Sequence, residues 1–515
     1  MDLVASPSLP PGWAEAHLSD FCHIVQGQSP PGDTYNTTGE GVPFFQGKSE
    51  FGPLYATPRK WCSAPTKMAA RDDILISIRA PVGPTNLCPE AACIGRGLAA
   101  IRPQGGVPIR YVLYGIHATE EKLAEKATGT TFEAISGDAL RTHRLTLAPL
   151  PEQHRIVAEI ERQFSLLDAG IANLKRVQAN LKRYRAAVLQ TACTGQLVPT
   201  KAETAQAEGR AYEPAAVLLT RILAERQARW EAAQLAKMEA QGKLPLSGAW
   251  KAKYQEPTAP NTTKLSRLPE GWAWCRLQSL VSALGDGLHG TPEYSVGTDC
   301  YFINGNNLVD GRIVIKPQTK TVSATEMQKH RKQMTLNTVL VSINGTLGNV
   351  AFYNNEKVVL GKSACYFNLW RLIEKRYIRL VIESPYFVKY ASENATGSTI
   401  QNLGLKAMND FPIPLPPLAE QERIVAEVER RLSVVDNLEQ VVKANLKRAE
   451  RLRQAVLKEA FAGRLVPQDP ANEPASVLLE RIKAEREAQA KAPAKAKVPA
   501  KAAREAGRKQ GVFTL

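Results

Sequence analysis

The chain contains two copies of one long segment. Residues 149–199 and residues 417–467 align without a gap at a constant offset of 268 positions, and about half of the aligned residues are identical. This period is far too long for a solenoid, whose repeats are short supersecondary units. The duplication therefore indicates two tandem copies of a whole module, each ending in a long helix. A chain of this kind can present two similar surfaces about a pseudo-two-fold axis.

Shorter matches extend the duplication into the regions that precede the long segments. The runs DILISIRA and TVLVSING are continuously apolar, which is typical of buried strands. Between the matching anchors the two halves differ in length and composition, so we expect a common framework that carries different loops. The anchors are Leu-Pro-x-Gly-Trp at 9–13 and 268–272, the apolar runs at 73–80 and 338–345, and Ala-Thr-Gly-Thr-Thr and Ala-Thr-Gly-Ser-Thr at 127–131 and 395–399.

The two repeated segments have the hydrophobic pattern of a coiled coil. Apolar residues recur at alternating spacings of four and three, and each predicted helix stops near Gly195 or Gly463, which suits a left-handed cap. One such helix alone would be unstable in water, so we expect the two to pair with each other in antiparallel fashion. The alternative is a homodimer in which each helix pairs with its own copy. The predicted seam consists of Ile160, Phe164, Leu167, Ile171, Leu174, Leu181 and Val188, and of Val428, Leu432, Val435, Val442, Leu446 and Val456.

These features predict an α+β fold. Two similar, mostly β globular domains are separated by two long helices that form an antiparallel coiled coil, with a pseudo-two-fold internal repeat. After each long helix, a second weak repeat with the pattern EPAxxLLxRIxAER predicts a short helix. The expected organisation is a globular domain at 1–150, a long helix at 151–198, a short helix and linker at 199–266, a second globular domain at 267–417, a long helix at 418–466, a short helix at 467–490, and a basic disordered tail at 491–515.

The charge of the chain favours a polyanionic partner. The net charge is +16, and the chain stays basic without residues 488–515, which hold seven Lys or Arg and one Glu. No run of eighteen apolar residues exists and the N-terminus lacks a signal-peptide pattern, so we expect a cytoplasmic protein without a membrane span. The eight cysteines form no CxxC pair, which argues against zinc and favours reduced cysteines that pack as small apolar residues.

A search for catalytic motifs finds none. The sequence lacks a GxxxxGK[ST] phosphate loop, a GxGxxG nucleotide motif, a GxSxG elbow, an HExxH motif and the Asn-Pro-Pro-aromatic tetrad of adenine methyltransferases. The seven histidines form no ligand cluster. We therefore expect no catalytic residue, no metal site and no cofactor bound by this chain.

Several residues are candidates for DNA contact. The Thr-Gly-[Ser/Thr]-Thr segments precede runs with helical spacing, so Thr131 and Thr399 are candidate N-caps whose helix starts could bind phosphate. Arg and Asn are also the side chains that read guanine and adenine edges. Each of these residues could equally be an ordinary cap, turn or surface residue. The candidates are Lys48, Arg79, Gly129, Thr130, Thr131, Asn306, Asn344, Gly397, Ser398 and Thr399.

The duplicated motifs, taken in order, resemble the specificity subunit of type I restriction–modification systems. The resemblance covers nearly the whole chain. It is carried by the LPxGW openings, by Ser29-Pro30 and Thr291-Pro292, by TG[ST]T, and above all by PLxEQxRIVAExER leading into each long helix with GxLVP after it.

The resemblance implies a non-catalytic subunit that reads a bipartite, asymmetric target in double-stranded DNA. Each globular half would be a target-recognition domain, and the coiled coil would set the distance between the half-sites. Two methyltransferase subunits would methylate adenine at N6 with S-adenosylmethionine, flipping the target base. Restriction subunits would add ATP- and Mg²⁺-dependent translocation and cleavage.

Two rival functions are open at this stage. One is a structural coiled-coil tether whose two β domains bind proteins, and it predicts no salt-dependent binding of duplex DNA. The other is a solitary enzyme with an unrecognised site, and it predicts methyl transfer by the purified chain alone. The DNA sequence of the target cannot be read from the residues.

Overall fold

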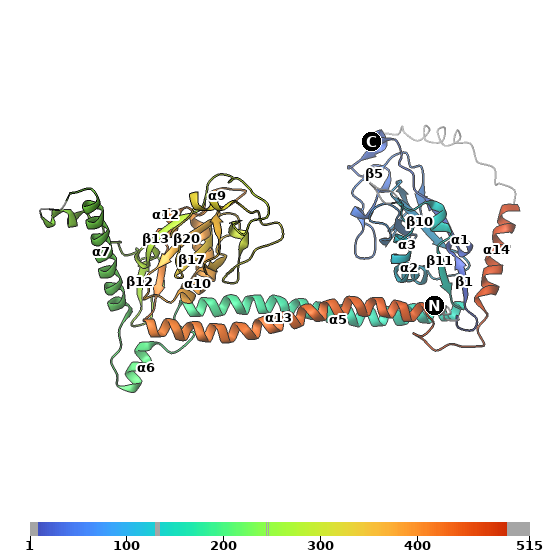
Figure 1. The fold of residues 1–515 in the computed structure, drawn as a ribbon. Coiled ribbons are helices and arrows are strands. Elements are labelled where there is room, and N and C mark those ends of the chain that lie inside the picture. Colours follow the sequence, from blue (N-terminus) through green and yellow to red (C-terminus); the bar gives the residue numbers. More distant parts are fainter. Residues whose placement is uncertain (1–8, 129–133, 244, 246, 492–515) are drawn as a thin grey trace, which may run out of the picture. The chain divides into compact units, whose positions relative to one another are not determined.

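The computed structural model describes residues 9–128, 134–243, 245 and 247–491, and these fall into two compact units. The first unit joins the chain up to Leu174 with the part that begins at Ala444, and the second runs from Lys175 to Lys443. The boundary lies inside the two long helices, α5 (Leu150–Cys193) and α13 (Leu418–Phe461), which run continuously through it (Figure 1). The predicted tail from residue 492 onward lies outside the described residues.

The first unit is built around an antiparallel four-stranded sheet in the order β2-β10-β7-β8. Its central strand β7 (Ile74–Ser77) is buried along its whole length, as the apolar run at 73–80 predicts. A two-stranded ribbon, β1-β11, joins the domain to α5, and a smaller sheet has the order β3-β5-β4-β9-β6. The elements are β1 (Ala14–His17), α1 (Leu18–Phe21), β2 (Cys22–Gln26), β3 (Tyr35–Asn36), β4 (Val42–Phe45), β5 (Trp61–Cys62), β6 (Met68–Ala69), β7, β8 (Thr85–Leu87), β9 (Ala92–Ile94), β10 (Leu98–Pro103), α2 (Ile109–Ala118), α3 (Glu120–Ala124), α4 (Gly137–Arg141) and β11 (Arg144–Leu147), with 3₁₀ turns η1 (Gly32–Thr34) and η2 (Lys48–Glu50).

The second unit repeats this framework. Its four-stranded sheet has the order β13-β20-β17-β18, its ribbon is β12-β21, and the parallel pair β14-β19 matches β4-β9. The central strand β17 (Thr338–Ser342) is again fully buried. The elements are β12 (Ala273–Arg276), α8 (Leu277–Leu280), β13 (Val281–Asp286), β14 (Tyr301–Ile303), η4 (Gly305–Asn307), β15 (Leu308–Val309), β16 (Arg312–Ile313), α9 (Ala324–Lys329), β17, β18 (Val350–Phe352), β19 (Val358–Leu360), β20 (Ala364–Leu369), α10 (Lys375–Glu383), α11 (Pro385–Asn394), α12 (Leu405–Asp410) and β21 (Pro412–Leu415).

The motifs that open each half join the globular domain to its long helix. Trp13 Nε1 donates to Glu152 Oε1 at 3.3 Å, and Trp272 Nε1 donates to Glu420 Oε1 at 2.9 Å. Burial raises the pKa of both carboxyl groups, and the indole hydrogen bonds oppose that shift. The LPxGW and PLxEQ motifs therefore form one buried polar junction in each unit.

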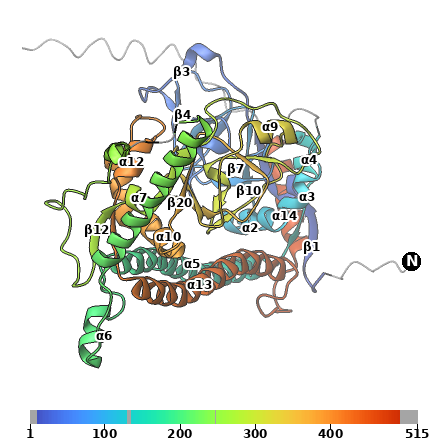
Figure 2. The same cartoon turned by 60° about the vertical axis from the view of Figure 1, so that its left-hand side comes forward.

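The long helices lie side by side in antiparallel fashion within each unit (Figures 1 and 2). In the first unit Arg453 of α13 pairs with Asp168 of α5, and in the second unit Arg185 of α5 pairs with Asp436 of α13. The two pairs occupy equivalent positions of the repeat. The predicted α+β fold with two similar domains and two antiparallel helices is confirmed.

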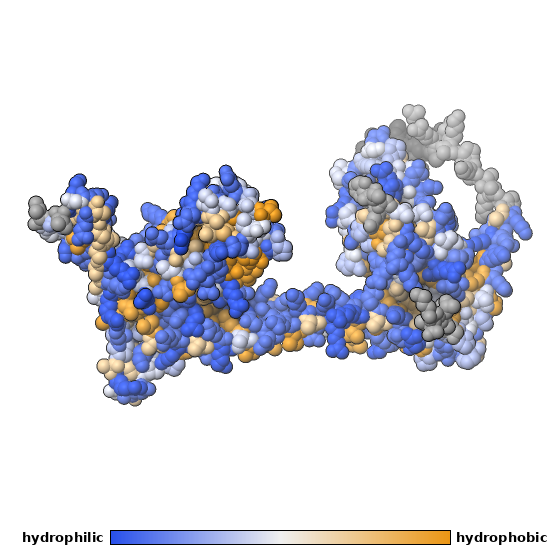
Figure 3. All heavy atoms as spheres, in the orientation of Figure 1, coloured by the Kyte–Doolittle hydropathy of each residue, from blue (hydrophilic) through white to orange (hydrophobic). Residues whose placement is uncertain are grey.

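The residues of the predicted seam are buried or half-buried. In α5 the structure buries Ile160, Phe164, Leu181 and Val188, and it half-buries Leu167, Ile171 and Leu174. In α13 it buries Val428, Val435 and Val442, and it half-buries Leu432, Leu446 and Val456. The face of the helices seen in Figure 3 is mostly hydrophilic, with apolar side chains between the polar ones.

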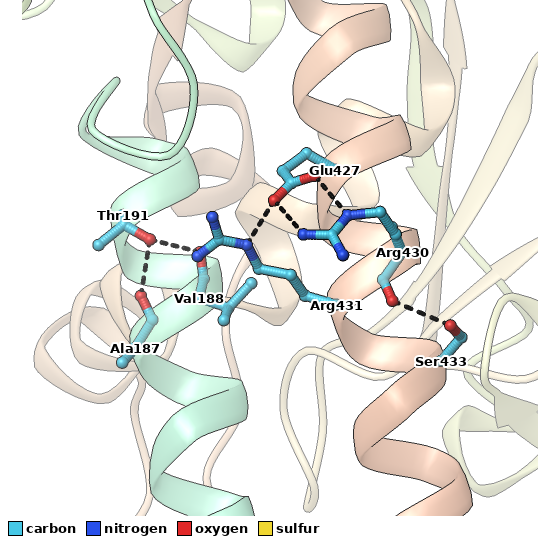
Figure 4. Close-up of polar contacts among 7 residues, drawn as sticks. All are labelled: Ala187, Val188, Thr191, Glu427, Arg430, Arg431 and Ser433. Carbon is cyan, nitrogen blue, oxygen red and sulfur yellow. Dashed lines mark hydrogen bonds and ion pairs between the residues drawn. The ribbon is translucent and has the colours of Figure 1, made fainter.

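Ion pairs between residues of the same helix lie on the surface of the long helices. Glu427 accepts from Arg430 Nε at 2.8 Å and from Arg431 Nε at 2.6 Å (Figure 4). These hydrogen bonds lower the pKa of Glu427 to about 2. The equivalent pair, Glu159 with Arg162, does the same in α5.

Each long helix ends as its sequence predicts. Gly195 and Gly463 adopt φ values of +70° and +71°, a left-handed conformation that glycine takes without strain. A Cβ on either glycine would lie 2.3 Å from the ring of a proline of the LPxGW motif, Pro269 or Pro10. Glycine is therefore required both by the turn and by this close packing.

A helical arm follows each long helix. The arm α7 (Ala215–Ala240) is longer than the short helix expected after the first repeat, because residues 231–240 continue with helix-forming residues. It is preceded by α6 (Lys201–Glu208) and followed by the 3₁₀ segment η3 (Gly248–Lys253). The second arm is α14 (Ala475–Lys491).

The arms are fixed by equivalent arginines. Arg226 of α7 donates to the carbonyl oxygens of Gln278 and Val281 in the second unit. Arg486 of α14 donates to the carbonyl oxygens of Ser19 and Cys22 in the first unit. Each arm thus satisfies carbonyl groups at the ends of a one-turn helix, α8 or α1.

Candidate nucleic-acid interface

In the first unit three loops meet beside the main sheet. One follows β4 and carries Lys48, one follows β7 and carries Arg79, and the third is the turn between β9 and β10. Two backbone hydrogen bonds connect them: Gly95 N donates to Phe45 O at 2.8 Å, and Ile78 N donates to Gly97 O at 3.0 Å. The turn between β9 and β10 is therefore hydrogen-bonded to both the loop after β4 and the loop after β7.

The second unit brings the equivalent loops together. Asn306 follows β14, Asn344 follows β17, and the turn joins β19 to β20. Gly361 N donates to Ile303 O at 2.8 Å, and Ile343 N donates to Ser363 O at 3.0 Å. The two pairs of candidates, Lys48 with Asn306 and Arg79 with Asn344, thus occupy equivalent places.

The Thr-Gly-Ser-Thr segment forms a loop closed by its own backbone. Thr396 N donates to Asn402 O at 2.9 Å and Asn402 N donates to Thr396 O at 2.8 Å, so Gly397, Ser398 and Thr399 lie on an exposed loop between them. The expectation that Thr399 caps a helix is wrong. The helix α12 begins only at Leu405, with Gly404 as its N-cap, because residues 396–402 fold back into this closed loop.

This loop is attached to the loop after the central strand. Asn344 Nδ2 donates to Asn402 Oδ1 at 3.2 Å, and Gly345 N donates to Gln401 O at 2.9 Å. The half-buried Asn344 amide is therefore engaged within the protein.

In the first unit the backbone of Arg79 forms a β-bridge with Ala134, equivalent to the β-bridge between Asn344 and Asn402 in the second unit. Thr128 N also donates to Ala134 O at 2.9 Å. The candidates Gly129, Thr130 and Thr131 lie outside the described residues. The helix that follows, α4, begins at Gly137, and the Ser136 hydroxyl accepts from Ala139 N at 3.0 Å as its cap.

The exposed side chains around the two turns suit a polyanion. Lys48, Arg79 and Arg96 are exposed cations in the first unit, and Lys362 is one in the second, where the Asn306 amide is exposed. Cations and amides on exposed loops are the groups that contact phosphates and base edges in DNA. Burial raises the pKa of Glu120, on α3, and the charge of Lys48 opposes that shift.

Arg96 and Lys362 were missed by sequence reasoning. Each lies in the turn that connects the other loops, in the short patterns Gly-Arg-Gly (95–97) and Gly-Lys-Ser (361–363). These patterns precede apolar runs, LAAI and ACYF, that become the equivalent strands β10 and β20. An alignment of the two halves over this stretch would have found them.

Other kinds of site are not evident in the part of the chain that the structure describes. No group of three or more His, Cys, Asp or Glu side chains is placed to hold a metal ion among these residues. None of their helices is long and apolar enough to cross a membrane. All eight cysteines are buried and unpaired, as expected for cysteines that pack as small apolar residues.

Comparison with known proteins matches both halves of the chain to one family. The model of the type I restriction modification DNA specificity domain matches residues 10–181 and 272–448. The chain belongs to this family. The two matched segments each include one globular domain with most of the long helix that follows it, so the duplication is a duplication of the specificity domain.

Named relatives are specificity subunits. The putative type I restriction enzyme MjaX specificity subunit of Methanocaldococcus jannaschii is 34% identical over 192 residues, which are 37% of this chain and 44% of that protein. The alignment thus spans less than half of that relative's length. The EcoBI specificity subunit of Escherichia coli is 21% identical over 93% of this chain and 94% of its own length.

Solved structures of specificity subunits are also similar. The HsdS subunit from Thermoanaerobacter tengcongensis is 46% identical over 36% of this chain and 46% of that chain, with a TM-score of 0.32. The S subunit of the type I system from M. genitalium is 12% identical over 91% of this chain and 99% of that chain, also with a TM-score of 0.32.

Proposed function

We propose that this chain is the non-catalytic specificity subunit of a type I restriction–modification system. It reads a bipartite, asymmetric sequence in double-stranded DNA, one half with each globular domain. The observation that carries the proposal is the specificity-domain match over both halves of the chain. The two equivalent groups of three loops support the proposal as DNA-facing surfaces, because they carry exposed cations and the exposed Asn306 amide.

The paired helices give this function its geometry. Two weak contacts on one molecule bind together much more tightly than either alone, because the second forms at a high effective concentration. In this proposal the two long helices serve as the ruler between the two reading surfaces. We therefore infer that the helix pair sets the number of base pairs between the half-sites.

The chemistry of the system resides in partner subunits. Two methyltransferase subunits assemble on this chain and methylate adenine at N6 with S-adenosylmethionine, and restriction subunits supply cleavage with ATP and Mg²⁺. A complex that acts on host DNA works in the cytoplasm. The purified chain alone is expected to leave DNA unmethylated, whereas its complex with methyltransferase subunits modifies both half-sites.

Binding of duplex DNA at increasing salt tests the proposal directly. The full chain in complex with its methyltransferase subunits is titrated into a fluorescent duplex of random sequence. The affinity should fall linearly on logarithmic axes as salt rises, with a slope of about −0.9 for each phosphate contacted. A complex that binds no duplex, while the chain still captures protein partners, would instead support the coiled-coil tether.

A further inference from the structure

The turn that carries Arg96 has the same backbone construction as the turn that carries Lys362. Leu98 N donates to Gly95 O and Ala364 N donates to Gly361 O, both at 3.0 Å, so each is a closed four-residue turn with the cation in its second position. On the other side, Gln28 N donates to Ile94 O at 3.0 Å and Leu288 N donates to Leu360 O at 2.7 Å. Both turns are therefore held from three sides by equivalent hydrogen bonds.

Close packing leaves little room for these turns to move. A Cβ on Gly97 would lie 2.3 Å from the carbonyl oxygen of Gln46, and a Cβ on Gly361 would lie 2.2 Å from Oδ1 of Asn304. The residues that follow β2 and β13 approach as closely: a Cβ on Gly27 would lie 2.2 Å from Gly95 O, and one on Gly287 would lie 2.1 Å from Leu360 O. Each cation thus projects from a rigid support, although its own side chain is exposed.

The flanking positions differ in charge between the two halves, whereas Arg96 and its equivalent, Lys362, are both cationic. Lys48 is matched by Asn306 and Arg79 by Asn344, so the flanking loops change in both charge and hydrogen bonding. At the turn, both halves place a cation. Residues that read bases must differ when the two half-targets differ, whereas a phosphate is the same at every step of the duplex.

We propose that Arg96 and Lys362 are the phosphate anchors of the two recognition surfaces. Each binds a backbone phosphate of its half-site and so positions the flanking loops, which carry the sequence readout. This inference rests on the proposed function and adds to it a division of labour within each domain.

The test compares Arg96→Gln and Lys362→Gln with the parent, all as complexes with methyltransferase subunits. Each variant is titrated with a random-sequence duplex and with a duplex carrying the target that methylated-adenine mapping defines. We expect each change to weaken the binding of both duplexes by the same factor, about 5- to 10-fold at about 0.1 M salt. The magnitude of the salt slope should fall by about 0.9. The methylated sequence should stay unchanged. The conservative change Arg96→Lys should keep the salt slope of the parent.

Matched controls remove a cation elsewhere. Arg144→Gln changes an exposed arginine of β11 that pairs with Glu15, and Lys237→Gln changes an exposed lysine of α7. Both should bind like the parent. Melting temperatures of Arg96→Gln and Lys362→Gln should be unchanged, because no hydrogen bond that fixes either turn uses the cationic side chain. Arg144→Gln loses an exposed ion pair, which contributes little to stability.

The outcomes separate the two proposals. If the parent complex binds no duplex, the proposed function fails. If the parent binds while Arg96→Gln and Lys362→Gln bind as tightly and with the same salt slope, the phosphate anchors are disproved. A changed methylated sequence in either variant would show that the residue reads bases, which also overturns the inference.

Discussion

At the scale of single residues, a buried histidine, His143, and a half-buried one, His117, make the first unit sensitive to acid. His143 Nε2 lies 2.8 Å from the hydroxyl of Thr119, and burial lowers the pKa of His143 to about 4. Burial also lowers the pKa of His117, whose Nε2 contacts the hydroxyl of Thr85. Burial therefore favours the neutral form of both rings in the folded protein.

Stability of the first unit should fall as the pH drops from about 6.5 toward about 4. Over that window the unfolded chain binds a proton at His143 that the folded chain rejects, so stability is full above the unfolded pKa and declines below it. The contribution of His143 to the free energy of unfolding is at most about 3.4 kcal/mol. Urea unfolding of the parent and of His143→Gln across this range measures it, and the substituted chain should show a shallower decline. Equal pH dependence in both would show that His143 does not remain neutral when buried.

Part of the candidate interface was predictable from single residues. Lys48, Arg79, Asn306 and Asn344 stand out because each follows an apolar run that ends at a turn. Arg96 does not follow such a run, and its place beside the other loops depends on hydrogen bonds of Gly95 to Phe45 and of Ile78 to Gly97, which join residues distant in sequence. Contacts of this kind leave no local signal.

At the scale of elements, the helix pair depends on its buried seam. Val435 is 2% exposed and Val434, its neighbour, is 53% exposed. We expect Val435→Asp to destabilise the second unit by about 3 kcal/mol or more, because it buries an unpaired carboxylate. The control Val434→Asp makes the same chemical change in water and should alter stability by less than about 0.5 kcal/mol. Denaturant unfolding of the two variants compares them, and equal stabilities would place Val435 outside a buried helix contact.

Long periodic elements were predictable, whereas short irregular ones were not. The four-three spacing predicts α5 and α13, and the continuous apolar runs predict β7 and β17, because burial on one face or both leaves a pattern in the residues themselves. Thr399 shows the limit. Its hydroxyl and the residues after it suit a helix start, but pairing of Thr396 with Asn402 closes a loop instead, and the helix begins at Leu405.

At the scale of the whole molecule, each unit contains the arm that follows the long helix of the other copy of the repeat. The arm α14, at the end of the second copy, contributes Leu478 and Ile482 to the core of the first unit, while α7 contributes Leu218 and Ile222 to the core of the second. The sequence pattern predicts both arms but not the surfaces against which they pack. The amphipathic pattern of each arm predicts that one of its faces is buried. Which surface covers that face depends on tertiary packing.

The independence of the two units leads to the most direct test of the proposed function. Residues 9–148 are replaced by the matching segment of another specificity subunit, and methylated adenines are mapped in DNA modified by the complex. The framework strands and junction residues match between the two halves of this chain, so we expect a hybrid with another specificity domain to assemble. We predict that one half of the methylated sequence changes while the other half and the spacing between them stay the same. If both halves change together, or if neither changes, the claim that each domain reads its own half of a bipartite target is contradicted.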